Sequence, residues 1–213
     1  MQDDQRPLLT LLGGGVRSGK SRYALTLAEE LGSRRVFIAT AEPLDDEMRR
    51  RIDRHREERA EGFITIEEPL ALPERLRSLW RLPGTEQTSA PNTFAPDVTP
   101  DVIVVDCLTL WISNLLVRDQ TEEQVSLQMD RLLNALRERR SHVILVSNEV
   151  GMGLVPETPL GRIFRDVMGA LHQRLAAEAD HLVVGTMGAL LRIHPGPIAL
   201  IRARAIASGE GAV

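Results

Sequence analysis

The sequence predicts an α/β fold in which helices flank a mainly parallel sheet. Short apolar runs rich in β-branched residues alternate along the chain with longer segments of helical periodicity. Several of the short runs are apolar at every position, as strands covered on both faces are. A glycine-rich loop connects the first short run to the first helical segment. The length of 213 residues suits a single domain, 1–213.

Six short runs are the expected strands, because each is strongly apolar and most are rich in valine or isoleucine. They cover residues 8–12, 35–39, 63–66, 102–106, 142–147 and 181–185. Three longer segments are expected helices. The first follows Lys20 and should end at Gly32, and the second follows Thr121, which has capping-box spacing with Gln124. The third should cover residues 159–179.

Two segments depart from this alternation. Residues 82–100 are rich in proline and small polar residues, so we expect a flexible surface insertion without catalytic residues. Residues 194–213 have one short apolar stretch and a glycine-rich end, which predicts a C-terminal tail.

Composition excludes several kinds of protein. The formal net charge of −4 gives no global reason to bind nucleic acid or an anionic membrane, so we expect no nucleic-acid partner. No run approaches the roughly 20 apolar residues of a membrane span, and the first residues lack a signal-peptide pattern, which predicts a cytoplasmic protein. Cys107 is the only cysteine, so neither an internal disulfide nor a cysteine-built metal site can form within one chain. We expect Cys107 to be a buried apolar filler, and a catalytic thiol is the alternative.

Residues 14–21, GGVRSGKS, match the phosphate-binding pattern G-x-x-x-x-G-K-[ST] between a strand and a helix. Backbone N–H groups of such a loop, together with the helix N-terminus, surround phosphate oxygens. We expect Lys20 to reach the β- and γ-phosphates and the Ser21 hydroxyl to ligate Mg²⁺. The loop residues are Gly14, Gly15, Val16, Arg17, Ser18 and Gly19. The alternative is a glycine-rich turn with a lysine in it by chance.

Asp106 ends the apolar run 102–106, where a buried parallel strand would deliver a carboxylate to the metal. A cap for the following helix is the alternative role. With the phosphate loop, this arrangement predicts a nucleotide-binding α/β domain but no particular reaction. The fold class that we expect is a P-loop NTPase of the RecA-like type.

His55 lies in a charged segment, residues 45–59, that has a single helical stripe. Met48, Ile52, His55 and Arg59 follow one another at intervals of four, three and four, so His55 should face the protein. Spacing alone favours a histidine satisfied by a neighbouring carboxylate. A neutral imidazole beside arginines could instead attack a phosphorus atom.

Five blocks of sequence together resemble the bifunctional adenosylcobinamide kinase / adenosylcobinamide-phosphate guanylyltransferase family of cobalamin biosynthesis. The blocks are GGGVRSGKSRYA, FIATAEPLDDEMRRRIDRHREER, EEPLAL, VIVVDCLTLWISNLL and VSNEVGMGLVPETPLGRIFRDVMGALHQRLAAEAD, and the likeness spans about residues 9–193. The resemblance implies that ATP or GTP, with Mg²⁺, phosphorylates adenosylcobinamide. GMP then passes from GTP through a guanylylated histidine to adenosylcobinamide phosphate, giving adenosylcobinamide-GDP.

The resemblance also implies roles for individual residues. His55 falls on the guanylylated histidine of the family, which reverses the interpretation from spacing. The implied nucleotide contacts are Ala39, Thr40 and Ala41, then Arg56, Glu57, Glu58 and Arg59, and finally Glu67 and Asp106. Asn148 and Glu149 should lie at a strand end beside the phosphate loop, but they receive no firm role. His172 stands where the family has asparagine, and we interpret it as structural. A homo-oligomer, a trimer by resemblance, is expected.

Two other functions use part of the same pattern. A small-molecule kinase would need the phosphate loop and Asp106 but not His55. A RecA-like ATPase module would hydrolyse ATP to drive assembly or partner binding, without turnover of cobinamide.

Overall fold

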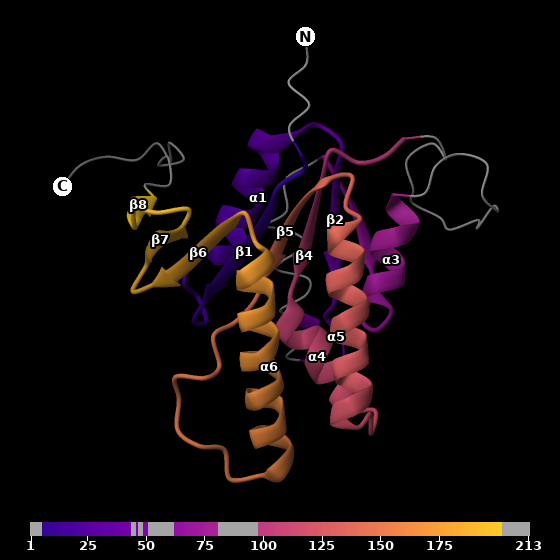
Figure 1. Cartoon of the computed structure of the whole chain (residues 1–213), viewed down its shortest axis with the longest axis vertical. Coiled ribbons are helices and arrows are strands. Elements are labelled where there is room, and N and C mark those ends of the chain that lie inside the picture. The colour runs from indigo at the N-terminus through magenta and orange to yellow at the C-terminus, as the bar shows by residue number, and fades with distance from the viewer. Residues whose placement is uncertain (1–5, 44–45, 47–48, 51–61, 81–97, 202–213) are drawn as a thin grey trace.

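The computed structural model describes residues 6–43, 46, 49–50, 62–80 and 98–201. Its strands form one eight-stranded sheet in the order β3-β2-β4-β5-β1-β6-β7-β8 (Figure 1). They are β1 (Leu9–Gly14), β2 (Arg35–Ala39), β3 (Phe63–Glu67), β4 (Val102–Asp106), β5 (His142–Val146), β6 (His181–Thr186), β7 (Ala189–His194) and β8 (Ala199–Ile201). Strands β1 to β6 pair in parallel, which confirms the mainly parallel sheet.

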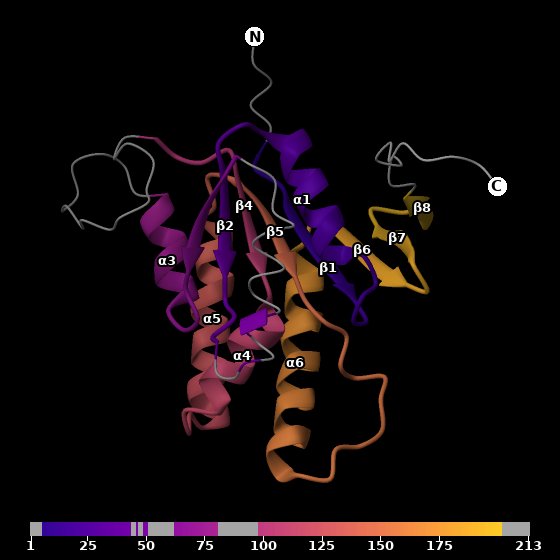
Figure 2. The same ribbon diagram turned by 180° about the vertical axis from the view of Figure 1, so that it is seen from behind.

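Helices cover both faces of this sheet (Figures 1 and 2). One face is covered by α1 (Lys20–Leu31), which packs on β1, β4 and β5. The opposite face carries α3 (Leu72–Leu79), α4 (Leu108–Leu116), α5 (Glu122–Arg137) and α6 (Pro159–Glu178). No helix in these described residues is both long and apolar enough to cross a membrane.

Strand residues alternate between two apolar cores, as the period of two requires. On β1, Leu9 and Leu11 belong to the core beneath α3 to α6. Leu12 belongs to the core beneath α1, together with Ala24 and Ala28 of that helix. All five side chains are at most 3% exposed. Each large aliphatic side chain buried in this way contributes roughly 1.5–3 kcal/mol to folding.

The three predicted helices are confirmed, and α5 begins with the predicted capping box. The side chain of Thr121 accepts a hydrogen bond from the Gln124 amide at 3.3 Å, and the Gln124 side chain accepts one from the Thr121 amide at 2.9 Å. The inner face of α5 is buried through Val125, Met129, Leu132, Leu133 and Leu136. Helix α1 stops before Gly32, and α6 stops at Glu178.

The C-terminal tail prediction is wrong in part. Strands β7 and β8 extend the sheet in antiparallel pairing beyond β6, so residues 199–201 are a strand rather than tail. These strands are short, and an exposed glycine and proline segment joins them, which hides their pattern in the sequence. Helices α3 and α4 were also not predicted. Residues 82–97 of the predicted insertion, which covers 82–100, lie outside the described residues.

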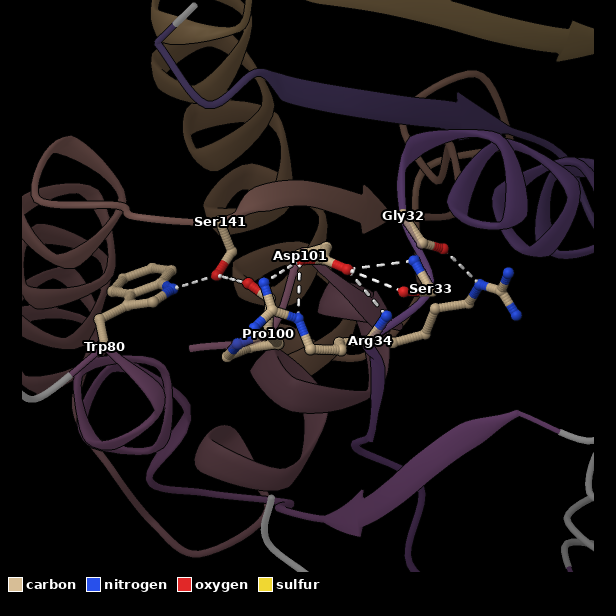
Figure 3. A network of polar contacts seen from close by, with 8 residues as sticks. Gly32, Ser33, Arg34, Trp80, Pro100, Asp101 and Ser141 are labelled. Carbon is tan, nitrogen blue, oxygen red and sulfur yellow. Dashed lines mark hydrogen bonds and ion pairs between the residues drawn. The ribbon is translucent and has the colours of Figure 1, made fainter. Parts of the chain in front are cut away.

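A polar network fixes the edge of the sheet where β2 and β4 begin (Figure 3). Asp101 accepts hydrogen bonds from the backbone amides of Ser33 at 3.1 Å and Arg34 at 2.9 Å, and from the Arg34 side chain. Trp80 donates through Nε1 to Ser141 Oγ at 3.0 Å. Hydrogen bonding by Arg34 lowers the pKa of Asp101 to about 2. These contacts hold the edge opposite the phosphate loop.

Asp101→Asn should lower the free energy of unfolding by about 1 kcal/mol near neutral pH. The substitution removes the carboxylate charge that strengthens the hydrogen bonds accepted by residue 101, and the effect is modest because the site is partly exposed. The folded pKa lies below the ordinary value of 3.8, so this stabilisation is complete above about pH 4 and is lost as the pH falls toward 2. Urea denaturation at a series of pH values checks this. A difference between wild type and variant that grows on acidification would contradict it.

Candidate active site at the carboxyl edge of the sheet

Parallel pairing brings the ends of five strands to one edge of the sheet. Ala39, at the end of β2, is in register with Glu67 of β3 and with Asp106 of β4. Asp106 is in register with Val146 of β5. The phosphate loop leaves the same edge after Gly14 of β1. The structure therefore gathers the predicted residues 14–21, 39–41, 67 and 106 along one edge.

The loop between β1 and α1 has the backbone that its glycines permit. Gly14 and Gly19 have φ angles of 142° and 87°, which other residues rarely adopt, and Arg17 has a φ of 57°. The Ser18 amide donates to the Gly15 carbonyl at 3.3 Å, which closes a turn within the loop. Gly15, Val16 and Arg17 are exposed at its crest. The curled loop and the helix start predicted for a phosphate site are both present.

Gly185 of β6 is a site residue that sequence reasoning missed. A Cβ on Gly14 would lie 2.4 Å from the Gly185 carbonyl oxygen, and a Cβ on Gly185 would lie 2.8 Å from Ser18 Oγ. Both positions must therefore be glycine for β6 to support the loop this closely. Ser18 Oγ is buried and, within the described residues, has no hydrogen-bond partner.

Lys20 is the only lysine in the chain and begins α1. Its side chain is buried, and Nζ donates to the Gly15 carbonyl at 3.2 Å, so the ammonium lies against the loop. Burial lowers the pKa of Lys20, and the nearby Asp106 carboxylate opposes that shift. The electrostatic attraction between a buried ammonium and a phosphate is stronger than that of an exposed ammonium, because water screens it less.

Thr40 fastens the end of β2 to the end of β4. Its hydroxyl donates to the Cys107 carbonyl at 2.7 Å and accepts from the Cys107 amide at 2.8 Å. Its own amide donates to the Asp106 carbonyl at 3.2 Å, and its carbonyl accepts from Asn114 at 2.8 Å. These bonds fix the backbone that carries Asp106. Nucleotide contact through Ala39, Thr40 and Ala41 stays a prediction.

Cys107 is buried, and desolvation raises the pKa of its thiol to about 12. A thiol with this pKa stays protonated near neutral pH and is a poor nucleophile. The expectation of an apolar filler is confirmed.

Glu67 is separated from the phosphate loop along the sheet edge. Strands β2, β4 and β5 lie between β3 and β1, which places the ends of β3 and β1 roughly 19 Å apart at the usual strand spacing. One phosphate group cannot touch both ends. Glu67 is exposed, so it is accessible to a ligand that extends along the edge.

His55, Arg56, Glu57, Glu58 and Arg59 lie outside the described residues. Of the charged segment that carries them, Asp46, Arg49 and Arg50 are described and are helical. The chain leads into this segment from the carboxyl end of β2, which lies at the edge that holds the phosphate loop.

Glu42 and Arg118 hold the start of that connection. Arg118 Nη2 donates to Glu42 Oε1 at 2.7 Å, and its Nη1 donates to the Asn114 carbonyl at 3.0 Å. The chain leaving β2 is therefore tied to α4. This pair was not predicted, because the two residues are 76 positions apart.

A polar group beside the phosphate loop was also missed. The Glu149 amide donates to the Gly14 carbonyl at 3.0 Å, which confirms the expectation that residues 148–149 lie next to the loop. Ser147 Oγ lies 2.7 Å from His172 Nε2 of α6. His172, interpreted from sequence as structural, is thus connected to a segment that touches the loop.

Comparison with known proteins shows the family of this chain. The family model described as cobinamide kinase / cobinamide phosphate guanyltransferase matches residues 10–193. The bifunctional adenosylcobalamin biosynthesis protein CobP of Pseudomonas aeruginosa is 39% identical over 188 residues, covering 88% of this chain and 98% of that protein. CobU of Escherichia coli is 34% identical, covering 87% and 100% of the two chains.

CobU of Salmonella typhimurium is 37% identical over 199 residues and is covered completely. Among solved structures, the RadB recombinase aligns over 92% of this chain and 86% of its own, with 19% identity and a TM-score of 0.47. The family match covers the phosphate loop, Asp106 and the segment after β2 together. The chain belongs to the cobinamide kinase / cobinamide phosphate guanyltransferase family.

Proposed function

We propose that this enzyme phosphorylates adenosylcobinamide with ATP or GTP, and then transfers GMP from GTP to give adenosylcobinamide-GDP, at the carboxyl edge of its sheet. The observation that carries the proposal is the buried Lys20, which donates to the curled phosphate loop and has the Asp106 carboxylate as a charged neighbour. That arrangement suits phosphoryl transfer, which depends mainly on positioning and on neutralising phosphate charge.

In the kinase step, the loop amides and Lys20 would bind the nucleotide phosphates. Ser21 and Asp106 would hold Mg²⁺, because a hydroxyl and a carboxylate supply the oxygen ligands that this ion prefers. The shift that Asp106 causes in the pKa of Lys20 supports their closeness. Bound Mg²⁺ would neutralise charge on the β- and γ-phosphates. The cobinamide hydroxyl would then take the γ-phosphoryl group.

In the second step, His55 would act as the nucleophile. An imidazole nitrogen forms a bond to the α-phosphorus of GTP while the bond to the β-phosphate oxygen breaks, and pyrophosphate leaves. A phosphate oxygen of adenosylcobinamide phosphate then attacks the same phosphorus and releases the imidazole. Arg56 and Arg59 would counter the developing negative charge. The carboxyl end of β2, from which the chain leads into this segment, lies at the loop edge and supports this role.

Three further features remain proposals. The nucleotide would be contacted by six residues that the family resemblance implies, namely Arg56, Glu57, Glu58, Arg59, Glu67 and Asp106. We also propose a cytoplasmic homo-oligomer, a trimer by the same resemblance. The exposed Glu67, distant from the phosphate loop, would meet a part of the nucleotide away from its phosphates.

Product analysis separates this function from that of a plain small-molecule kinase. With adenosylcobinamide and GTP as the only nucleotide, the purified protein should form adenosylcobinamide phosphate first and adenosylcobinamide-GDP afterwards, with release of pyrophosphate. Chromatography of corrinoid products over time measures both. Accumulation of the phosphate without the GDP derivative would favour the kinase, and nucleotide hydrolysis without corrinoid products would favour an ATPase module.

A further inference from the structure

Four polar side chains form a series of contacts next to the phosphate loop, namely Thr109, Ser147, His172 and Glu149. Thr109 of α4 lies 3.4 Å from Ser147, through their hydroxyl oxygens, and Ser147 Oγ lies 2.7 Å from His172 Nε2. The other ring nitrogen of His172, Nδ1, faces Glu149 Oε2 at 3.9 Å. The Glu149 amide contacts the phosphate loop at Gly14. These contacts connect α4, the end of β5 and α6.

The hydrogen-bond donors among these four side chains can all point in one direction, from Thr109 toward Glu149. Thr109 Oγ1 accepts from the Asn148 amide at 2.7 Å, so its own proton can point at Ser147 or at the Cys107 thiol. Ser147 can then donate to His172 Nε2, which leaves the ring proton on Nδ1, facing Glu149. Burial lowers the pKa of His172, with Glu149 opposing, and so favours the neutral ring that this arrangement needs.

Glu149 is the solvent-accessible end of this series of side chains. Thr109 and Ser147 are buried, whereas the Glu149 side chain is 38% exposed. Its Oε1 accepts from the Gly151 amide at 2.6 Å, and its Oε2 faces the His172 ring. The carboxylate is thus held by the Gly151 amide, has the His172 ring beside its other oxygen, and is open to a ligand. The buried hydroxyls of Thr109 and Ser147 have hydrogen-bond partners other than Glu149, so Glu149 is not needed to pair them.

The position of Glu149 in the sheet suits an acceptor for phosphoryl transfer. Strand β5 lies between β1, which leads to the phosphate loop, and β4, which ends at Asp106 (Figure 1). The terminal phosphate of a nucleotide bound between Lys20 and Asp106 would therefore lie over the end of β5. Glu149 follows that end by three residues.

We propose that Glu149 accepts the proton of the cobinamide hydroxyl during the kinase step, and that His172 is the positioning residue that orients its carboxylate. The hydroxyl oxygen forms a bond to the γ-phosphorus as the bond to the β-phosphate oxygen breaks. The hydroxyl proton passes to Glu149 and is then released to water. This inference depends on the proposed kinase reaction, which the wild-type products test separately.

Glu149→Gln tests the proton acceptor. Its kcat for phosphorylation of adenosylcobinamide should fall about 10²-fold or more, with the KM for nucleotide changed less than about threefold. Guanylyl transfer to supplied adenosylcobinamide phosphate should continue. Glu157→Gln, an exposed carboxylate on the same connection, is the matched control and should behave as wild type. A kinase kcat within about threefold of wild type, or parallel loss of both reactions, would overturn the proposal.

Two variants at His172 separate its two contacts. Asparagine places an amide nitrogen near the position of Nδ1, so His172→Asn should keep a donor facing Glu149 and most of the kinase kcat. Glutamine reaches the position of Nε2 instead, so His172→Gln should keep the Ser147 contact and lose about tenfold or more in kcat. The opposite pattern, or equal activity in both variants, would show that His172 serves only Ser147 or the core.

Discussion

His55→Ala should abolish guanylyl transfer while phosphorylation of adenosylcobinamide continues at close to the wild-type rate. Removal of a covalent nucleophile commonly costs about 10⁴-fold or more in rate, because no neighbouring group replaces the bond it forms. The kinase reaction moves the γ-phosphoryl group directly to an alcohol and does not need the imidazole. Assaying each half-reaction alone, with adenosylcobinamide or with its phosphate as substrate, measures the two effects.

His194→Ala is the matched control, because His194 is an exposed histidine at the end of β7. It should leave both reactions unchanged. Equal loss of both reactions in His55→Ala would assign His55 a structural or nucleotide-binding role, and retention of both would exclude it as the nucleophile.

Lys20→Met should reduce the kinase kcat on the order of 10³-fold, since a cation that meets transition-state charge in a dry site is worth several kcal/mol. Stability should not fall in proportion, because the substitution also removes a charge whose burial is unfavourable. Steady-state kinetics and urea denaturation of the same variant measure the two quantities. A kcat within tenfold of wild type would contradict the role of Lys20 at the phosphates.

The uniqueness of this lysine gives a second measurement. Isotopic methylation labels only Lys20 and the chain terminus, so NMR can follow the Lys20 amine during a pH titration. Its pKa should lie below the ordinary value of 10.5, because burial disfavours the charged form. Adding nucleotide should raise it, since phosphate favours the ammonium. A pKa above 10.5 without nucleotide would contradict the buried environment.

Local patterns predicted the parts of the fold that depend on local chemistry. The phosphate loop, the Thr121 capping box and six parallel strands are each encoded within a few consecutive residues. Strands β7 and β8 were missed because a short antiparallel extension has few buried residues to reveal its period. Helix α4 was missed because seven of its nine residues are buried, which leaves no polar face to show a helical period.

Only those parts of the site that lie within one continuous segment of sequence were predictable. Ser147 and His172 are 25 positions apart, and Thr109 and Ser147 are 38 apart, so no spacing in the sequence signals their contact. Gly185 was missed for the same reason, since its importance comes from Gly14 and Ser18 across the sheet. Family resemblance supplied the role of His55, which spacing alone disfavoured.

Isolation of the covalent intermediate and its transfer to substrate would test the nucleophile itself. Wild-type protein incubated with GTP labelled at the α-phosphorus, then freed of nucleotide, should retain label that survives alkali and is lost in acid, as a phosphorus–nitrogen bond is. Peptide mapping should place the label on His55, and added adenosylcobinamide phosphate should remove it as labelled adenosylcobinamide-GDP. Product formation by a protein that never carries label, or label on another residue, would contradict guanylyl transfer through His55.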